Sequence, residues 1–413
     1  MKKYVLVGCG SRGIYAYAIP LVRDFAEEAE LCGVYDINVK RAKLVSEMCG
    51  KEIPVYESFS QMIETVKPDT VIVASKDCTH DQYVIQALYA SCDVIVEKPL
   101  TTTFEKALAI QKAEEETGKK VTVVFNLRFH PFFKQIKEIV ASGAIGVVYS
   151  VNYEWMLDTD HGGDYFRRWH RQRENSGSLM VHKSTHHFDI ANWLLEQEPL
   201  EVNAYGARHY YGPVRENRSE RCLNCPHNET CEFYKDIHKN ESWKTLYFNC
   251  EDADGYFIDR CVFSEQINIE DTVNLTVRYS GGTLMNYMLT AHSPYEGFRL
   301  VLNGSLGRLE VKKITGKKPN FDAEKDNYIK LYNRNEEEIF IPVRPDTAGG
   351  HGGADDGLRE ALFKGMPEDP LCQMADTRAG RMSIGIGMAA NISMAENRKV
   401  YLDEFYKELE NKR

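Results

Sequence analysis

The sequence predicts an α/β protein of two domains, with a doubly wound parallel sheet first and an α+β domain with a mainly antiparallel sheet after it. In the first part of the chain, short β-branched runs alternate with longer amphipathic stretches, which is the pattern of βαβ units. From about residue 146, longer alternating segments are joined by turn residues, which indicates antiparallel hairpins. We therefore expect a first domain over residues 1–126 and a second over residues 127–413.

Composition and charge exclude several classes of protein. The 413 residues include 43% apolar and 27% charged residues, as in ordinary globular proteins. The formal charge of −10, without a long Lys/Arg run, argues against nucleic-acid binding. No run reaches the roughly 18 to 20 apolar residues that span a bilayer, and the apolar start stops at Gly8, so we expect neither a membrane span nor a signal peptide. Eleven scattered cysteines favour a reducing, cytoplasmic compartment.

Five short apolar runs are the expected strands of the first sheet. Their length and spacing are typical of strands that are buried on both faces and connected by helices. After the first run, a helix is expected over Ile14–Glu27. The runs are Val5–Val7, Leu31–Tyr35, Val71–Ala74, Val94–Val96 and Val121–Phe125.

Three strand–turn–strand patterns predict hairpins in the second domain. Each joins two segments through Gly, Asn or Ser residues that favour tight turns. Helical periodicity returns over residues 355–397, with a break near Met366-Pro367, and Phe405–Arg413 is charged enough to be a solvated tail. The paired segments are Thr272–Tyr279 with Thr283–Leu289, Phe298–Leu302 with Arg308–Val311, and Tyr328–Tyr332 with Glu338–Ile341.

A glycine-rich motif, Gly8-Cys9-Gly10-Ser11-Arg12-Gly13, lies between the first strand and its helix. Glycines there allow a tight turn, a close backbone approach to a pyrophosphate and close helix–strand packing, while the start of the helix offers N–H groups to phosphates. A purely structural turn is the alternative, and the strand, the helix and a following acid together argue against it. We expect a dinucleotide to bind at Gly8, Gly10, Ser11, Arg12 and Gly13.

The following acid is Asp36, which closes the second expected strand. Its carboxylate would accept hydrogen bonds from the adenosine ribose hydroxyls and repel a 2′-phosphate, so NAD is favoured over NADP. Arg41 lies about one turn later and keeps NADP open as an alternative.

Glu97-Lys98-Pro99 ends the fourth expected strand, at the sheet edge where open α/β folds bind their ligands. A lysine on a turn fixed by proline can donate to a substrate hydroxyl and stabilise the alkoxide that forms as a proton leaves. A surface lysine at a strand end is the structural alternative.

The sequence resembles the Gfo/Idh/MocA superfamily of oxidoreductases over essentially the whole chain. The resemblance rests on the glycine-rich motif, Glu97-Lys98-Pro99, Asn126-Leu127-Arg128-Phe129 and the segment Gly177–Trp193. The resemblance implies a Rossmann domain that binds NAD(P), then an α/β domain with an open, mostly antiparallel sheet. It also implies that a sugar or polyol is oxidised in the cleft, and that copies pair through the open sheet as homodimers or homotetramers. The expected cofactor-binding residues then also include Ser75, His80, Glu97, Lys98 and Asn126.

The second-domain motif departs from the family pattern. Plain dehydrogenases of the family look like Gly-Gly-x-x-x-Asp-x-x-x-His-x-x-Asp, and the same frame runs here from Gly177 to Asp189. His186 falls on the family's catalytic histidine, whereas His182 replaces the usual aspartate. At i, i+4 spacing, the two histidines would share one helix face. We expect His186 to be the base, Lys98 to stabilise the alkoxide, and His182 to orient or bind the substrate.

Two alternatives stay open for this histidine pair. Two histidines on one helix are commonly structural or solvated. A zinc or manganese ion at His182 and His186 is the other alternative, although no carboxylate at the family position completes such a site.

Two segments are candidates for contact with a sugar. The stretch from His161 to Arg171 is loop-like and rich in aromatic and ionisable residues, which suit sugar faces and hydroxyls. A later glycine-rich loop, residues 349–355, contains His351. A charged surface loop is the alternative for both segments. The expected substrate-binding residues are His161, Tyr165, Arg168, Trp169, His170 and His351.

Three cysteines, Cys222, Cys225 and Cys231, fall within ten residues, and Cys250 or Cys261 can supply a fourth thiol. Tetrahedral zinc held by four cysteines is the common cytoplasmic solution for such a cluster. We favour a structural zinc at Cys222, Cys225, Cys231 and Cys261, and an iron–sulfur cluster, free thiols or disulfides are the alternatives. The insertion, residues 214–262, is then expected to form a metal-pinned lobe near the cleft.

Three functions fit the sequence. The first is NAD-dependent oxidation of a hydroxyl of a sugar, sugar derivative or polyol. The second is a redox-neutral NAD-dependent glycosidase, which oxidises a ring hydroxyl transiently, eliminates the aglycone, adds water and returns the hydride. The third is a non-catalytic NAD-binding regulator, against which the presence of both Lys98 and His186 argues.

Overall fold

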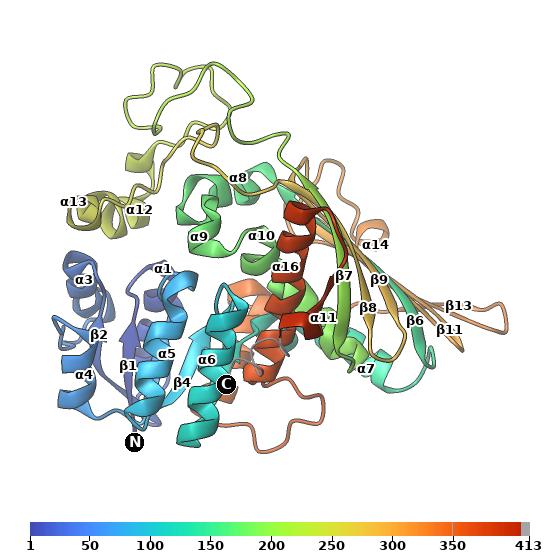
Figure 1. Ribbon diagram of the computed structural model, residues 1–413, viewed down its shortest axis with the longest axis horizontal. Helices are drawn as coiled ribbons and strands as arrows, with labels where there is room; N and C mark the ends of the chain where they lie inside the picture. The colour runs from blue at the N-terminus through green and yellow to red at the C-terminus, as the bar shows by residue number, and fades with distance from the viewer. Residues whose placement is uncertain (349, 406–413) are drawn as a thin grey trace.

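The first domain is built on a parallel sheet. A computed structural model describes residues 1–348 and 350–405, and within them this sheet has five strands in the order β2-β1-β3-β4-β5 (Figure 1). The order reverses between β1 and β3, which is where open α/β sheets bind ligands. The strands are β1 (Lys2–Val7), β2 (Ala29–Tyr35), β3 (Thr70–Val73), β4 (Asp93–Glu97) and β5 (Val121–Val124). All five match the runs that the sequence predicts.

Helices cover this sheet, and polar side chains set where several of them begin. The side chains of Asn38, Ser58 and Thr103 accept hydrogen bonds from backbone N–H groups of the first turn of α3, α4 and α6. The helices are α1 (Ser11–Gly13), α2 (Ile19–Arg23), α3 (Val39–Cys49), α4 (Phe59–Val66), α5 (His80–Tyr89) and α6 (Phe104–Thr117).

The helix after the glycine motif is shorter and less regular than expected. A π-helical turn over Ile14–Ala18 joins α1 to α2, and the helix ends at Arg23, whereas the sequence predicted a continuous helix to Glu27. Pro20 has no N–H to offer the preceding turn, and the Ile19 N–H instead bonds to the Ile14 carbonyl, five residues back.

The second domain is built on a mixed sheet that is mostly antiparallel. Among the described residues it has nine strands, in the order β13-β12-β11-β10-β6-β9-β8-β7-β14, and β6 pairs with β9 in parallel. The strands are β6 (Val148–Asp158), β7 (Pro199–Ala207), β8 (Thr272–Tyr279), β9 (Leu284–Ser293), β10 (Gly297–Gly304), β11 (Gly307–Ile314), β12 (Tyr328–Asn333), β13 (Glu338–Ile341) and β14 (Val400–Tyr401). The three predicted hairpins are confirmed, whereas β6, β7 and β14 were not predicted individually.

Helices of the second domain pack on one face of this sheet, α8 against β6 and β9 and α16 against β7. Buried and exposed residues alternate along β8, so the other face is open to solvent. The helices are α7 (Pro131–Ala141), α8 (Thr159–Arg167), α9 (Arg173–Ser176), α10 (Leu179–His182), α11 (Thr185–Leu195), α12 (Glu241–Leu246), α13 (Glu251–Asp254), α14 (Ala323–Asp326), α15 (Ala354–Phe363) and α16 (Thr377–Glu396). The last two confirm the helical periodicity and the break predicted between 355 and 397.

Helix α16 packs against both domains and lies between them in Figure 1. Ile384 and Met388 belong to the hydrophobic core of the first domain, whereas Ile386 and Ala389 belong to that of the second. A Cβ at Gly387 would stand 2.4 Å from the backbone oxygen of Met180, so glycine allows α16 to approach α10 closely. This contact fixes the position of α10 beside the first domain.

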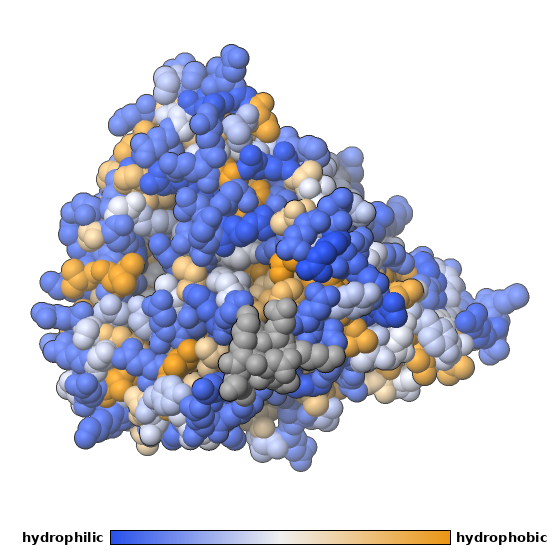
Figure 2. Space-filling model, viewed as in Figure 1, coloured by the Kyte–Doolittle hydropathy of each residue, from blue (hydrophilic) through white to orange (hydrophobic). Residues whose placement is uncertain are grey.

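The insertion between β7 and β8 reaches from the second domain toward α3 of the first (Figure 1). Its residues on the face shown in Figure 2 are mainly hydrophilic. The predicted solvated tail is only partly described: Phe405 stacks on Phe104 with ring centroids 4.3 Å apart, and residues 406–413 lie outside the described residues. In the described ranges, no helix combines the length and the apolar character that crossing a membrane requires.

Candidate active site

A cavity of about 1110 Å³ opens at the carboxyl ends of the parallel strands. Its walls come from the glycine motif, the ends of β3 and β4, helices α8, α10 and α11, and the insertion. Every residue predicted to bind cofactor or substrate or to act in catalysis lines it, except Gly13. The lining residues of that set are Gly8, Gly10, Ser11, Arg12, Asp36, Arg41, Ser75, His80, Glu97, Lys98, Asn126, His161, Tyr165, Arg168, Trp169, His170, His182, His186 and His351.

The three glycines of the motif have different reasons to be glycine. Gly8 has a φ of +93°, and a Cβ there would stand 2.5 Å from the backbone of Ala74. Gly13 lies outside the cavity wall, and its Cβ would stand 2.0 Å from the Gly8 oxygen, so it serves helix–strand packing. At Gly10 a Cβ would meet only the Tyr247 hydroxyl, at 3.8 Å, and would project into the cavity. This open cradle fits the passage of a dinucleotide pyrophosphate.

Asp36 lies where the sequence placed it, at the end of β2. Its carboxylate accepts hydrogen bonds from the backbone N–H groups of Cys9 and Asn38, both at 2.7 Å. Burial raises the pKa of Asp36, although Arg41 and these two N–H groups act in the opposite direction. The Arg41 guanidinium is 3.6 Å from the carboxylate, so the two side chains lie together at one end of the cavity.

Several predicted cofactor residues also hold the two domains together. Arg12 forms ion pairs with Glu97 at 2.6 Å and with Asp355 of α15 at 3.0 Å. Asp355 also accepts from Asn126 at 2.7 Å and contacts His351 Nδ1 at 2.8 Å. Burial alone would raise the pKa of Asp355, but His351 and Arg12 hold it well below its usual range. The network orients these side chains around the cavity.

Lys98 and the two predicted histidines converge in the cavity, but not as the sequence predicted. His182 ends α10 and His186 lies in α11, so they do not share one helix face: the helix breaks at Lys183 and Ser184. Lys98 Nζ donates to the backbone oxygen of His182 at 3.0 Å, and burial lowers its pKa. Loop geometry rather than helical spacing therefore brings the three together.

His186 lines the cavity as a buried imidazole. Burial lowers its pKa well below the usual value, and the nearby charges of Lys98 and Lys183 lower it further. The imidazole is therefore neutral at pH 7. Among the described residues, the buried Nδ1 of His186 has no hydrogen-bond partner. The neighbouring His187 also has an unpartnered nitrogen among the described residues, Nε2, but it does not line the cavity: its Nδ1 contacts the Tyr287 hydroxyl at 2.7 Å and its ring stacks on Trp155.

His182 is paired with a carboxylate that the sequence analysis missed. Its Nδ1 lies 2.6 Å from Oδ2 of Asp77, which follows β3, and both side chains are buried. Burial raises the pKa of Asp77 well above its usual value and lowers that of His182. The uncharged pair therefore holds one proton in the short contact and a second on Nε2 of His182.

The predicted substrate segment is helical rather than a loop, since α8 spans Thr159–Arg167. His161 Nδ1 lies 3.0 Å from the Glu296 carboxylate, and its Nε2 lies 2.9 Å from the Tyr165 hydroxyl. Trp169 stacks on His170 with ring centroids 3.8 Å apart, and His170 lies 4.3 Å from the His182 ring. Aromatic faces and polar groups thus line the cavity next to the histidines, as a sugar site requires.

Sequence reasoning missed several residues of the cavity wall, among them five polar side chains. Asp77 could have been found, because it follows a predicted strand at its carboxyl end, where ligands of α/β sheets bind. Lys183 lies over the Trp155 ring, and burial lowers its pKa to about 8. No local pattern marks the others, which come from the insertion or from a β turn far along the chain. The five are Asp77, Lys183, Tyr247, Tyr256 and Glu296.

The predicted zinc site is not supported. Cys222, Cys225, Cys231 and Cys261 do line one small pocket, but no cluster of His, Cys, Asp or Glu within the described part of the chain is arranged to hold a metal ion. The guanidinium of Arg167 donates to Cys222 Sγ at 3.3 Å and brings a positive charge to the pocket. Burial also raises the pKa of Cys222, which favours the neutral thiol.

The parallel sheet, the glycine cradle and the shared cavity define a dinucleotide-binding protein with a second domain on the substrate side. Residues 2–125 match the family model described as "Oxidoreductase family, NAD-binding Rossmann fold", and residues 137–402 match "Oxidoreductase family, C-terminal alpha/beta domain". The chain belongs to the Gfo/Idh/MocA family of oxidoreductases. This confirms the family and the fold class that its motifs predict.

Relatives of known sequence support the same family. A Bacillus subtilis protein named "Putative oxidoreductase YteT" is 38% identical over 98% of this chain and 99% of its own length. The inositol 2-dehydrogenase of Rubrobacter xylanophilus is 33% identical, over 43% of this chain and 48% of that protein. An oxidoreductase from Agrobacterium radiobacter, solved with NAD+, L-tartaric acid and magnesium, has the same fold with a TM-score of 0.66, at 16% identity over 98% of this chain and 99% of that one.

Proposed function

We propose that the protein oxidises a hydroxyl group of a sugar, a sugar derivative or a polyol, with NAD as hydride acceptor. The observation that carries this proposal is the meeting of Lys98 and His186 in the same cavity as the glycine cradle. Relatives named inositol 2-dehydrogenase support a polyol-like substrate, although they match only about half of the chain.

His186 takes the hydroxyl proton in this reaction, because its neutral imidazole is buried next to two lysines and has an unpartnered nitrogen among the described residues. Lys98 has three N–H groups, one of which goes to the His182 backbone oxygen, so the others can stabilise the alkoxide. Bound NAD supplies the acceptor for the hydride that leaves the same carbon. The carbinol loses one proton and one hydride and becomes a carbonyl.

A redox-neutral glycosidase is the second candidate, and the Asp77–His182 pair favours it. Elimination of an aglycone after transient oxidation needs a further acid or base, and the proton on Nε2 of His182 is suited to that role. In this reaction the hydride returns to the substrate, so NAD is regenerated in place.

We extend the proposal to assembly and compartment. The open face of the large sheet carries exposed Tyr205 and Leu284, and Tyr205 also lines a hollow of about 430 Å³, which suits pairing of two copies as a homodimer or homotetramer. The eleven cysteines are unpaired thiols, which suits a cytoplasmic protein. Light scattering at two concentrations tests the first point: a mass of one chain at both would contradict it.

To test the function, the protein is incubated with NAD and a panel of free sugars, polyols and aryl glycosides, and NADH absorbance and aglycone release are both measured. NADH that accumulates with a free sugar or polyol supports the dehydrogenase. Release of aglycone that requires NAD but leaves no NADH supports the glycosidase, and activity in neither assay favours a non-catalytic NAD-binding regulator.

Two variants test the assigned residues. Lys98→Met and His186→Ala should lose turnover while they still bind NAD. Lys120→Met, at the amino end of β5, and His209→Ala, exposed in the insertion, are matched controls that should keep it. Native turnover in Lys98→Met or His186→Ala would contradict the mechanism.

A further inference from the structure

The insertion of the second domain contacts the first domain next to the glycine motif. We call residues 241–256, which include α12 and α13, the strap. In Figure 1 these helices lie beside α3. Exposed side chains make one of the contacts, between Lys40 and Asp252 at 2.6 Å, but the remaining contacts are buried or half-buried.

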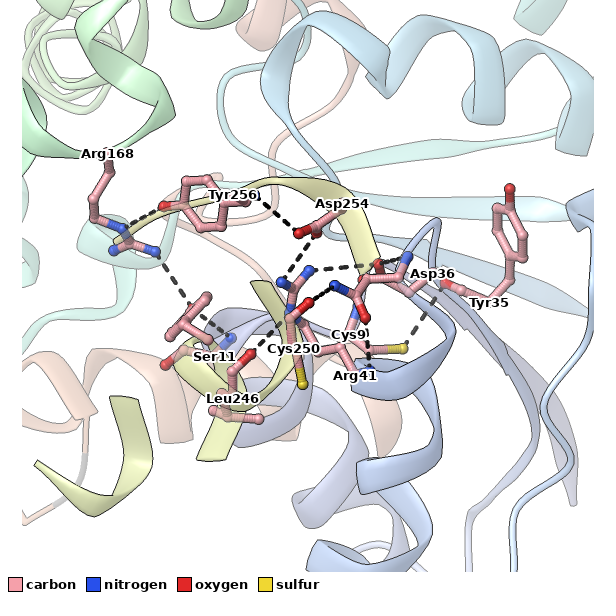
Figure 3. Close-up of polar contacts among 12 residues, drawn as sticks. Cys9, Ser11, Tyr35, Asp36, Arg41, Arg168, Leu246, Cys250, Asp254 and Tyr256 are labelled. Carbon is pink, nitrogen blue, oxygen red and sulfur yellow. Dashed lines mark hydrogen bonds and ion pairs between the residues drawn. The ribbon is translucent and has the colours of Figure 1, made fainter. Parts of the chain in front are cut away.

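The buried contacts bind the strap to the start of α3. Asn38 Nδ2 donates to the Cys250 backbone oxygen at 2.8 Å, and Arg41 Nε donates to the Leu246 backbone oxygen at 3.1 Å. Arg41 Nη2 also donates to the Asp254 carboxylate at 3.1 Å, as Figure 3 shows. The strap thus rests on the residues that follow Asp36, where the adenosine ribose of a dinucleotide is expected.

Tyr247 of the strap reaches the glycine motif itself. Its hydroxyl accepts a hydrogen bond from the Ser11 N–H at 3.1 Å. The guanidinium groups of Arg41 and Arg168 lie 5.4 and 5.6 Å from the centroid of its ring, and Arg168 also donates to its hydroxyl at 3.4 Å. The backbone N–H groups of this motif are those that receive phosphate oxygens, so the hydroxyl and a pyrophosphate compete for the same donor.

The strap also changes the charge around Arg41. Asp36 and Asp254 lie on either side of its guanidinium, at 3.6 and 3.1 Å. Two carboxylates and one guanidinium leave a net negative charge where a 2′-phosphate would have to lie. The charge of Arg41, which the sequence left open as a phosphate ligand, is therefore already balanced by carboxylates, and one of these, Asp254, comes from the second domain.

We propose that the strap is part of the dinucleotide site: it closes over the adenosine and pyrophosphate half of NAD and slows its release, and Asp254 acts with Asp36 to select NAD over NADP. This rests on the NAD-binding first domain and not on the proposed substrate. Tyr247, Asp254 and Tyr256 all line the main cavity, which also contains the glycine motif. Entry and release of NAD then require the strap to move.

The retention role is tested by stopped-flow release of NADH, with excess NAD as competitor and NADH fluorescence as the signal. Tyr247→Ala should speed release about tenfold, because it removes the ring near the Arg41 and Arg168 guanidinium groups. Tyr247→Phe keeps that ring and frees the Ser11 N–H, so it should bind NADH faster than the parent protein. Lys239→Met, an exposed side chain of the insertion outside the strap, is the control and should leave both rates unchanged.

The selection role is tested by the ratio of the dissociation constants for NADP and NAD. Asp254→Asn should shift this ratio about tenfold toward NADP, since one of the two carboxylates loses its charge. NAD should also protect residues 241–256 from hydrogen exchange. An unchanged release rate in folded Tyr247→Ala would overturn the retention role, and an unchanged binding rate in Tyr247→Phe would overturn the competition for the Ser11 N–H. An unchanged ratio in Asp254→Asn would overturn the selection role.

Discussion

Replacing Asp77 by asparagine tests what the short contact with His182 contributes to turnover. The two side chains are 2.6 Å apart and buried, so their hydrogen bond is well screened from water. A hydrogen bond between uncharged groups contributes about 0.5–1.5 kcal/mol. At about 1.36 kcal/mol for each factor of ten, kcat should fall about 2- to 13-fold if the pair orients His182 or moves a proton through it.

The assay is kcat and KM for the substrate found in the panel, measured over a range of pH, with NAD affinity measured in parallel. Asparagine keeps the shape of the side chain, so KM and NAD affinity should change little, whereas the pH profile of kcat should change because His182 titrates without a carboxylate partner. Asp81→Asn is the control, since Asp81 pairs with Lys106 outside the cavity. A kcat within twofold of the parent value would refute the reasoning.

Three further predictions concern charge, packing and metal. The pKa of Lys183 is about 8 in the fold and 10.5 in the reference state, so between these two pH values the folded protein binds fewer protons than the unfolded chain. The free energy of unfolding, measured with urea, should therefore rise with pH over this window by about 3 kcal/mol relative to Lys183→Met. Gly387→Ala should lower the free energy of unfolding by about 1–3 kcal/mol through its clash with α10, whereas Gly357→Ala, with no atom nearer than 3.5 Å, should not lower it. Because Arg167 donates to Cys222, mass spectrometry should find less than stoichiometric zinc, and one zinc per chain would contradict this.

The sequence was sufficient for the parts of the fold that depend on local pattern. Buried strands such as β3 are continuous apolar runs, and hairpins such as β8–β9 carry their turn residues between alternating segments. By contrast, β6 lies between β9 and β10, which follow it by more than a hundred residues, so no local pattern reveals its neighbours. Its parallel pairing with β9 arises only from the assembled sheet.

The candidate site divides in the same way. Lys98 and His186 could be predicted because each lies in a motif with a recognisable spacing, and the cavity contains both. The helix break between His182 and His186 could not be predicted, because the spacing of the two histidines alone fits one continuous helix. Tyr247 and Asp254 lie more than two hundred residues from the first strands, and only tertiary packing places Tyr247 at the glycine motif and Asp254 at Arg41.

Helices α15 and α16 have a consequence for the order in which the protein can be assembled. Leu358 and Phe363 of α15 pack in a core with strands of the first domain, and the backbone of Ala375 pairs with Val123 of β5. These residues of the first domain's core therefore leave the ribosome more than two hundred residues after its last strand, β5. A nascent chain that ends after β5 would display apolar surface, because the first domain cannot complete its core until the rest of the chain has emerged.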